Sequence, residues 1–138
     1  GSRGIHVYVP LEPRYSYSDI ADAAERIAKQ IVKRNPENTT TVRSLSTRKA
    51  NQVYIDHLQN AQGKTIVAPY SVRERAGATV SAPLTWKEVG GRVTPDDFTI
   101  QSMPKRIAKK GDLFTPVLQK GQRLEGALKR LAKLEQEK

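Results

Sequence analysis

An apolar stripe at helical spacing is the feature that most narrows what this sequence can fold into. Between Ser18 and the pair Asn35-Pro36, small and branched apolar residues recur at three- and four-residue steps: Ile20, Ala24, Ile27, Ala28 and Ile31. This spacing places them on one face of a helix, and such a face must be covered. We expect a helix that Ser18 caps and Pro36 stops, with its stripe packed against a sheet.

Runs of β-branched and aromatic residues supply that sheet. Residues 5–9 alternate in polarity, and residues 53–58 form the clearest run in the chain. Residues 39–42 and 65–68 are shorter, and Pro69 confines the latter to an edge or a bend. Runs of this composition are typical of strands. The sequence therefore predicts an α+β fold, with a mixed, mainly antiparallel sheet and flanking helices.

Three more helices are expected towards the C-terminus. Thr85 is placed to cap a short helix that begins at Trp86, a second helix covers residues 104–110, and a third follows Gly121. The last helix carries a leucine stripe: Leu124, Leu128, Leu131 and Leu134. Because about two heptads are too few for a coiled coil, we expect this helix to dock on the domain. Trp86 and Phe98 are expected in the core.

The charge of the chain indicates a polyanionic partner. Its 24 Lys and Arg outnumber 14 Asp and Glu, a net charge of +10 at pH 7, and 10 of the cations follow residue 103. Such a surplus favours nucleic acid, because each neutralised phosphate releases counterions. A membrane fits less well, since the last helix lacks aromatic anchors and no long apolar run occurs. The absence of cysteine excludes thiolate metal sites and fits a cytoplasmic protein.

Asp56 is the first candidate for chemistry. It lies among apolar neighbours in the run 53–58, and acids are depleted inside strands. A buried carboxylate is costly unless it has a partner. Two interpretations stay open, namely a salt bridge to a lysine or arginine, and a ligand for a hard divalent cation such as Mg²⁺ or Mn²⁺.

Basic and polar residues near the expected strand ends are further candidates. Residues 1–4 form a glycine-flanked turn before His6, and such a turn leaves backbone N–H groups free to hold a phosphate. A lone histidine on a strand is, however, more often structural. Lys49, Lys64 and Arg73 could converge on a phosphate, although each alone fits a solvated surface charge. No Walker-type loop, HExxH motif or nucleophile elbow occurs.

Taken together, these segments resemble a known family. Residues 1–11, GSRGIHVYVPL, are similar to the second motif of ligase D-type polymerase domains, in the archaeo-eukaryotic primase superfamily. Residues 53–60, VYIDHLQN, resemble the third motif, and residues 64–73, KTIVAPYSVR, resemble the block that follows it. Residues 83–86 and 97–100 also fit, so the resemblance runs in the family's order from Gly1 to about Leu113.

The resemblance implies an activity and a role for single residues. The family extends DNA ends at double-strand breaks, using nucleoside triphosphates with Mn²⁺ or Mg²⁺, beside a ligase module and the end-binding protein Ku. Asp56 matches its third metal-binding carboxylate, and His6 matches its motif histidine; both are assigned to catalysis. We assign four residues to the triphosphate and two to the nucleic acid: Ser2, Arg3, Lys49 and Arg73, then Arg48 and Lys64.

One part of the family's site has no counterpart in this sequence. The first motif is a pair of aspartates one residue apart, and the chain contains no Asp-x-Asp; Asp96 and Asp97 are adjacent and lie elsewhere. One carboxylate cannot hold two metals. The resemblance therefore implies the C-terminal portion of a primase-polymerase domain, incomplete as a catalytic domain and inactive alone. The alternative is a basic nucleic-acid-binding module without catalysis.

The resemblance also implies how the chain is divided. Residues 1–120 form the C-terminal part of the domain, with Gly1-Ser2 as native sequence, and residues 121–138 form a basic helix that leads towards a linker. We expect a bacterial, cytoplasmic, nucleoid-associated DNA-repair protein that acts in non-homologous end joining. An exposed sheet edge could pair with a second copy of the chain.

Overall fold

The computed structural model describes residues 4–136 and divides the chain into two compact units. Unit 1 combines Gly1–Leu11 with Ile66–Gln122, and unit 2 combines Glu12–Thr65 with Arg123–Lys138. Each unit is thus built from two segments that are far apart in the sequence. The expected division of the chain at residue 120 stays a prediction.

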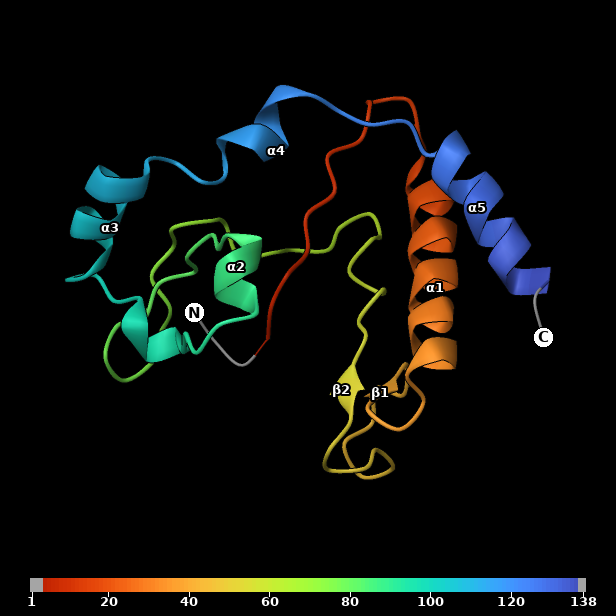
Figure 1. The fold of residues 1–138 in the computed structure, drawn as a ribbon, viewed down its shortest axis with the longest axis horizontal. Coiled ribbons are helices and arrows are strands. Elements are labelled where there is room, and N and C mark those ends of the chain that lie inside the picture. Colours follow the sequence, from red (N-terminus) through yellow and green to blue (C-terminus); the bar gives the residue numbers. More distant parts are fainter. Residues whose placement is uncertain (1–3, 137–138) are drawn as a thin grey trace. The chain divides into compact units, whose positions relative to one another are not determined.

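Helix α1, Tyr17–Arg34, begins at a capping box in unit 2 (Figure 1). The Ser16 Oγ accepts the Asp19 N–H at 3.2 Å, and the Asp19 carboxylate accepts the Ser16 N–H at 2.8 Å. The expectation that Ser18 caps this helix is wrong. Only Ser16 has an acid three residues later to complete the box, so Ser18 falls inside the first turn.

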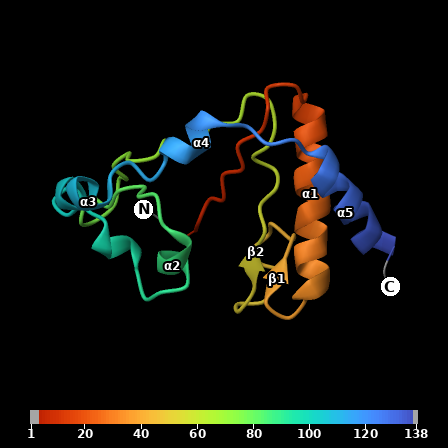
Figure 2. The ribbon, with the colours of Figure 1, turned by 45° about the horizontal axis from the view of Figure 1, so that its top comes forward.

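Helix α5, Glu125–Gln136, covers part of the stripe on α1, and the two helices lie side by side in both views (Figures 1 and 2). Ala23 and Ala28 on α1 are buried, as are Leu124 and Leu131. The docked leucine helix is therefore confirmed. The stripe packs on this helix and on the short strand β1, rather than on the broad sheet that the sequence predicts.

The only sheet within residues 4–136 has two parallel strands, β1 at Thr39–Thr40 and β2 at Val53–Tyr54. The Val53 N–H donates to the Asn38 carbonyl at 2.8 Å. The mixed α and β class is confirmed, but a mainly antiparallel sheet is not. Antiparallel pairing in the described chain is limited to two isolated bridges, Val72 with Val80 and Thr79 with Thr99.

The strands are shorter than the sequence predicts, and the reasons are local. Strand β2 ends at Tyr54, and two residues later the Asp56 carboxylate accepts the Leu58 N–H at 3.0 Å, which begins a turn. Residues 5–9 and 65–68 form no strand. A strand needs a neighbour to pair with, and the N-terminal segment finds one only just beyond this run, where the Gln122 N–H donates to Pro10 at 2.9 Å.

A small apolar core holds unit 1 together. Val80, Phe98 and Met103 are buried, and Tyr70 and Leu84 pack against them. Four short helical elements surround this core: α2 at Trp86–Val89, the 3₁₀ turn η1 at Pro95–Asp97, α3 at Met103–Lys110 and α4 at Thr115–Gln119. None of the helices in the described part of the chain is long and apolar enough to cross a lipid bilayer.

The start of α2 and both ends of α3 confirm the prediction to within a residue. Thr85 caps α2 as expected, and Glu88 completes a capping box with it. Helix α3 ends at Gly111, whose φ of 70° lies in the left-handed region that favours glycine. Both signals are local, so they can be read without knowledge of the fold.

The capping box gives a direct test of where α1 begins. Ser16→Ala removes the acceptor for the Asp19 N–H and should lower the free energy of unfolding by about 1 kcal/mol. Ser18→Ala is the matched control and should cost less than half as much, because its hydroxyl bonds only to that of Ser16. Urea unfolding followed by circular dichroism measures both. A larger loss for Ser18→Ala would contradict the assignment.

Candidate functional site

A hollow of about 710 Å³ opens in unit 1 beside the N-terminal segment. Tyr8 anchors this segment: its hydroxyl donates to the Val67 carbonyl at 3.4 Å, and its ring meets Phe114 edge-on with centroids 5.1 Å apart. The His6 ring stands edge-on to Tyr8 at 6.1 Å and lines the hollow. The anchors therefore place an exposed imidazole against a largely apolar wall.

Arg73 lines the same hollow from the stem of a short hairpin. Its N–H donates to the Thr79 carbonyl at 2.7 Å, and the turn between them closes through Gly77, whose φ is 82°. The Arg73 guanidinium makes no hydrogen bond or ion pair with any residue in the range 4–136. It is therefore available to bind an anion.

Trp86 also lines this hollow, which corrects the expectation of a core tryptophan. Its side chain is 79% exposed, whereas Phe98 is buried as expected. The physical reason is the shortness of α2: the helix is one turn long, and Trp86 is its first residue. An exposed indole and a free guanidinium around one hollow suit a ligand that combines a flat ring with an anion.

An ion pair that spans 18 residues fixes α2 to α3. The Glu88 carboxylate accepts from Arg106 Nη1 at 2.7 Å and from Lys110 Nζ at 2.6 Å. Arg106 lies 4.9 Å from the centroid of the Phe98 ring. The hydrogen bonds from Arg106 hold the pKa of Glu88 well below its usual range, against the opposing effect of burial. The sequence signals Glu88 only as a helix cap, and nothing in it indicates the partner.

A second contact missed from the sequence joins Tyr70 to the segment before α4. The Tyr70 hydroxyl donates to the Asp112 carboxylate at 2.6 Å and accepts the Leu113 N–H at 3.1 Å. Burial raises the pKa of Tyr70, and the bond to Asp112 raises it further. This contact fixes the chain next to Phe114, and thus one wall of the hollow.

Asp56 belongs to unit 2, and its side chain is exposed rather than buried. Its carboxylate accepts the Leu58 N–H, and the Tyr54 hydroxyl donates to it at 3.4 Å. No lysine or arginine in residues 4–136 forms a salt bridge with it, so the structure does not support that interpretation. The early end of β2 explains the exposure. Arg48 lies 5.6 Å above the Tyr54 ring, so one small cluster links Arg48 to Asp56.

The described residues do not complete a metal site. No group of three or more His, Asp or Glu side chains in residues 4–136 could hold a metal ion. Asp56 offers at most two oxygens, whereas Mg²⁺ takes about six ligands in octahedral geometry. Residues 4–136 therefore do not fit a divalent-metal centre by themselves.

The structure brings together only some of the residues that the sequence singled out. His6 and Arg73 line one hollow of unit 1, and Arg48 and Asp56 meet at Tyr54 in unit 2. Lys49 and Lys64 are exposed residues of unit 2, so their convergence with Arg73 stays a prediction. Ser2 and Arg3 lie outside the described residues.

Comparison with known proteins gives a consistent set of similarities. Residues 1–114 match the family model described as "LigD, primase-polymerase domain". The bifunctional non-homologous end joining protein LigD of Bacillus subtilis is 41% identical over 115 residues, which are 83% of this chain and 19% of that protein. The multifunctional non-homologous end joining protein LigD of Pseudomonas aeruginosa is 32% identical over 107 residues, 78% of this chain and 13% of that protein.

A solved structure shows the same similarity in three dimensions. The polymerase domain of Mycobacterium tuberculosis ligase D, in complex with DNA, matches with a TM-score of 0.71 and 32% sequence identity. The match covers 82% of this chain and 39% of that domain's chain. The chain thus spans a minor part of the proteins it resembles, and α5 begins after the residues that match the family model.

The Glu88 ion pair predicts that part of the free energy of unfolding is lost in acid. Because the folded state lowers the pKa of Glu88 from 4.5, its contribution is complete above about pH 4.5 and is lost as the pH falls below that value. Glu88→Gln should lower the free energy of unfolding by about 2 kcal/mol at pH 7. Its difference from the unchanged chain should shrink at pH 3.5.

Urea unfolding at the two pH values measures this effect. Glu74→Gln, on the exposed turn of the hairpin, is the matched control and should change stability at neither pH. An equal cost of Glu88→Gln at pH 7 and pH 3.5 would show that the charge of Glu88 is not what stabilises unit 1.

Proposed function

Because the chain belongs to the LigD primase-polymerase domain family, we propose that it forms part of a nucleotidyltransferase acting in bacterial non-homologous end joining. The enzyme extends DNA ends from nucleoside triphosphates by two-metal phosphoryl transfer. The observation that carries this proposal is the hollow of unit 1, which His6 and Arg73 both line within the residues that match the family. The net charge of +10 favours the same polyanionic substrate.

The hollow is assigned to the incoming nucleoside triphosphate. Its volume of about 710 Å³ falls within the usual range for small-molecule sites. The planar guanidinium of Arg73 suits bidentate contact with phosphate oxygens. The exposed ring of Trp86 offers a face on which a base can stack, and His6 adds a hydrogen-bond donor beside it. Ser2, Arg3 and Lys49 are further triphosphate contacts in this proposal.

The family's reaction needs more acids than this chain supplies. Asp56 is the one acidic residue that matches a metal-binding carboxylate of the family, and the sequence has no Asp-x-Asp. In this proposal Asp56 contributes a single ligand for Mn²⁺ or Mg²⁺, and carboxylates from outside the 138 residues complete the site. The chain alone is therefore proposed to be inactive.

The proposed partners follow from the family. DNA ends are the polymer substrate, with Arg48 and Lys64 on the nucleic acid, and a ligase module and Ku work beside the polymerase. The relatives are bacterial, so the proposed place of action is the nucleoid in the cytoplasm. Pairing of two copies through a sheet edge has less support, since β1 and β2 are two residues long.

A non-catalytic nucleic-acid-binding module is the second candidate. The observation that favours it is the absence of a cluster of metal ligands in the described residues, together with the strong positive charge. Both candidates predict DNA binding. Only the first predicts that a nucleoside triphosphate enters the hollow of unit 1, so nucleotide binding separates them.

The chain alone should not extend a DNA end. With a labelled 3′ end, nucleoside triphosphates and Mn²⁺, we expect no product above the level without protein, because one carboxylate cannot position two metals. A complete LigD polymerase domain serves as the positive control on gel electrophoresis. Clear extension by the 138-residue chain would refute its proposed inactivity while leaving the nucleotide site in place.

Nucleotide binding can be followed through the intrinsic fluorescence of Trp86, which is the one tryptophan of the chain and lines the hollow. GTP should change this emission, and Arg73→Ala should weaken GTP binding about ten-fold or more, since a charge-assisted contact is lost. Arg75→Ala, two residues further along the same hairpin, is the matched control and should bind like the unchanged chain. No response to GTP, or equal losses for both variants, would favour the non-catalytic module.

A further inference from the structure

Tyr70 has a backbone conformation that residues with a bulky side chain rarely adopt. Its φ is 65°, in the left-handed region that favours glycine. Ala78, in the turn of the neighbouring hairpin, is the one other non-glycine residue of the described chain with a positive φ. A tyrosine in this region is strained, and it persists only where the surrounding structure holds it there. Residues of this kind gather at functional sites, so the contacts of Tyr70 are the starting point.

The strained residue lies in a bulge at the base of the hairpin that carries Arg73. The Tyr70 N–H donates to the Ser81 carbonyl at 2.8 Å, and the Ser81 N–H donates to the Ser71 carbonyl at 2.9 Å. Tyr70 and Ser71 thus face one residue, and a left-handed first residue in such a bulge is usually glycine. Since side chains alternate along a strand, the extra residue decides which of them faces the hollow. Arg73 lines it, whereas Val72 is 56% exposed.

The side chain of Tyr70 holds a different part of the same unit. Its hydroxyl donates to the Asp112 carboxylate at 2.6 Å and accepts the Leu113 N–H at 3.1 Å. The Asp112 carboxylate also accepts the Phe114 N–H at 2.8 Å. We call these three hydrogen bonds the Tyr70 clamp. A glycine could form the bulge with less strain, but it could not form the clamp.

The Tyr70 clamp extends to His6 through two ring contacts. Phe114, directly after the clamped residues, meets Tyr8 edge-on with centroids 5.1 Å apart. Tyr8 in turn stands edge-on to His6 at 6.1 Å. Tyr70 therefore connects, through its backbone, to the hairpin of Arg73 and, through its hydroxyl, to the segment of His6. Both of these side chains line the hollow of unit 1.

We propose that Tyr70 is a positioning residue of the nucleotide site. Its place in the bulge aims Arg73 at the hollow, and its hydroxyl keeps His6 at a fixed separation from that guanidinium. This inference rests on the proposed function, in which both residues contact the nucleotide. Contacts whose separation is set before the ligand arrives bind it better, because less conformational entropy is lost on binding.

A purely structural role is the alternative, since the Tyr70 ring also packs against the core of Val80, Phe98 and Met103. Packing needs the ring, whereas positioning needs the hydroxyl as well. Tyr70→Phe keeps the ring and removes the clamp. The two roles therefore differ in what this one variant does to His6 and to nucleotide binding.

Nuclear magnetic resonance of the whole chain, without nucleotide, tests the positioning directly. The chain has two histidines, His6 in unit 1 and His57 in unit 2, so the second imidazole is an internal reference. We expect Tyr70→Phe to move the His6 imidazole signal and to weaken the Overhauser contact between the rings of Tyr8 and Phe114. The His57 signal should stay in place.

Two variants of Asp112 separate the clamp from its charge. One oxygen of Asp112 accepts both the Tyr70 hydroxyl and the Phe114 N–H. Asparagine offers an amide oxygen at the same place, so Asp112→Asn should leave the His6 signal unchanged. Asp112→Ala should move it as Tyr70→Phe does. Tyr17→Phe removes a hydroxyl from an exposed tyrosine of unit 2 and should change nothing.

The affinity for GTP, followed by the fluorescence of Trp86, tests what the positioning does for the nucleotide. Tyr70→Phe should weaken GTP binding about five-fold or more, and His6→Ala should weaken it as well. Because the Tyr70 hydroxyl acts through His6, the double variant should bind GTP like His6→Ala alone. Circular dichroism confirms that each variant is folded at the temperature of the measurement.

Three results overturn the proposal. The first is a His6 signal that Tyr70→Phe leaves in place, and the second is an equal movement of that signal in Asp112→Asn and Asp112→Ala. The third is a double variant in which the losses of Tyr70→Phe and His6→Ala add in full. If the unchanged chain binds no GTP, it is the proposed function that fails, and the nucleotide-free signals still show whether Tyr70 positions His6.

Discussion

The ion pair between Glu88 and Arg106 holds the part of unit 1 on which the candidate nucleotide site depends. A helix of four residues, such as α2, has no stability of its own in water. Its anchor is the Glu88 carboxylate, which accepts hydrogen bonds from Arg106, Lys110 and Thr85. Side-chain exposures of 15% for Glu88 and 14% for Arg106 make the loss of either partner costly. Since Trp86 begins this helix, the pair also holds the ring that lines the hollow.

Elements that depend on a few neighbouring residues could be predicted from the sequence, whereas elements that depend on distant segments could not. Helix ends were predicted well where a few neighbouring residues decide them, as with Thr85 and Gly111. The start of α1 was placed two residues late, because two serines compete and only the position of Asp19 selects Ser16. Strands were overestimated, since a suitable run becomes a strand only when another segment pairs with it. Residues 5–9 have the composition of a strand and lack the neighbour.

The side chains of the candidate site could likewise be predicted only where nearby residues decide their position. Motif order was enough to select His6 and Arg73, and the structure places both on one hollow. It was not enough for Trp86, Glu88 or Tyr70, whose roles depend on partners 18 to 43 residues away or on the shortness of a helix. Asp56 was expected to be buried from its apolar neighbours in sequence. The turn at Leu58 exposes it instead, which suits a ligand that is completed from outside the chain.

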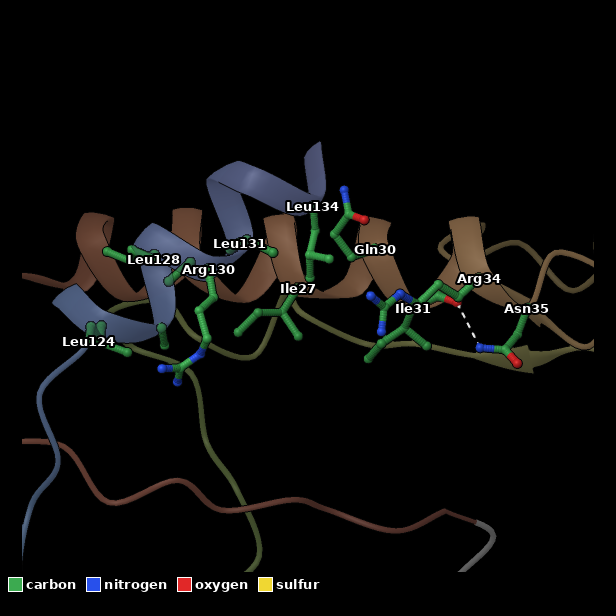
Figure 3. Close-up of a pocket in the computed structure, with 12 residues that line it drawn as sticks. Ile27, Gln30, Ile31, Arg34, Asn35, Leu124, Leu128, Arg130, Leu131 and Leu134 are labelled. Carbon is green, nitrogen blue, oxygen red and sulfur yellow. Dashed lines mark hydrogen bonds between the residues drawn. The ribbon is translucent and has the colours of Figure 1, made fainter. Parts of the chain in front are cut away.

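A net charge of +10 does not by itself identify one partner, because the cations of this chain differ in what surrounds them. Several are neutralised internally, as Arg26 is by Glu135 and Arg106 is by Glu88. The guanidinium of Arg73 makes no hydrogen bond or ion pair with a described residue and lines the same hollow as Tyr8 and Trp86, an environment for a base with its phosphates. The guanidinium groups of Arg34 and Arg130 make no hydrogen bond or ion pair with a described residue, and they line a groove of aliphatic side chains between α1 and α5 (Figure 3), where a phosphate chain would leave apolar surface in water. The same guanidinium group is therefore suited to the phosphates of a nucleotide in the hollow of unit 1 but not in this groove of unit 2, and the neighbouring side chains make the difference.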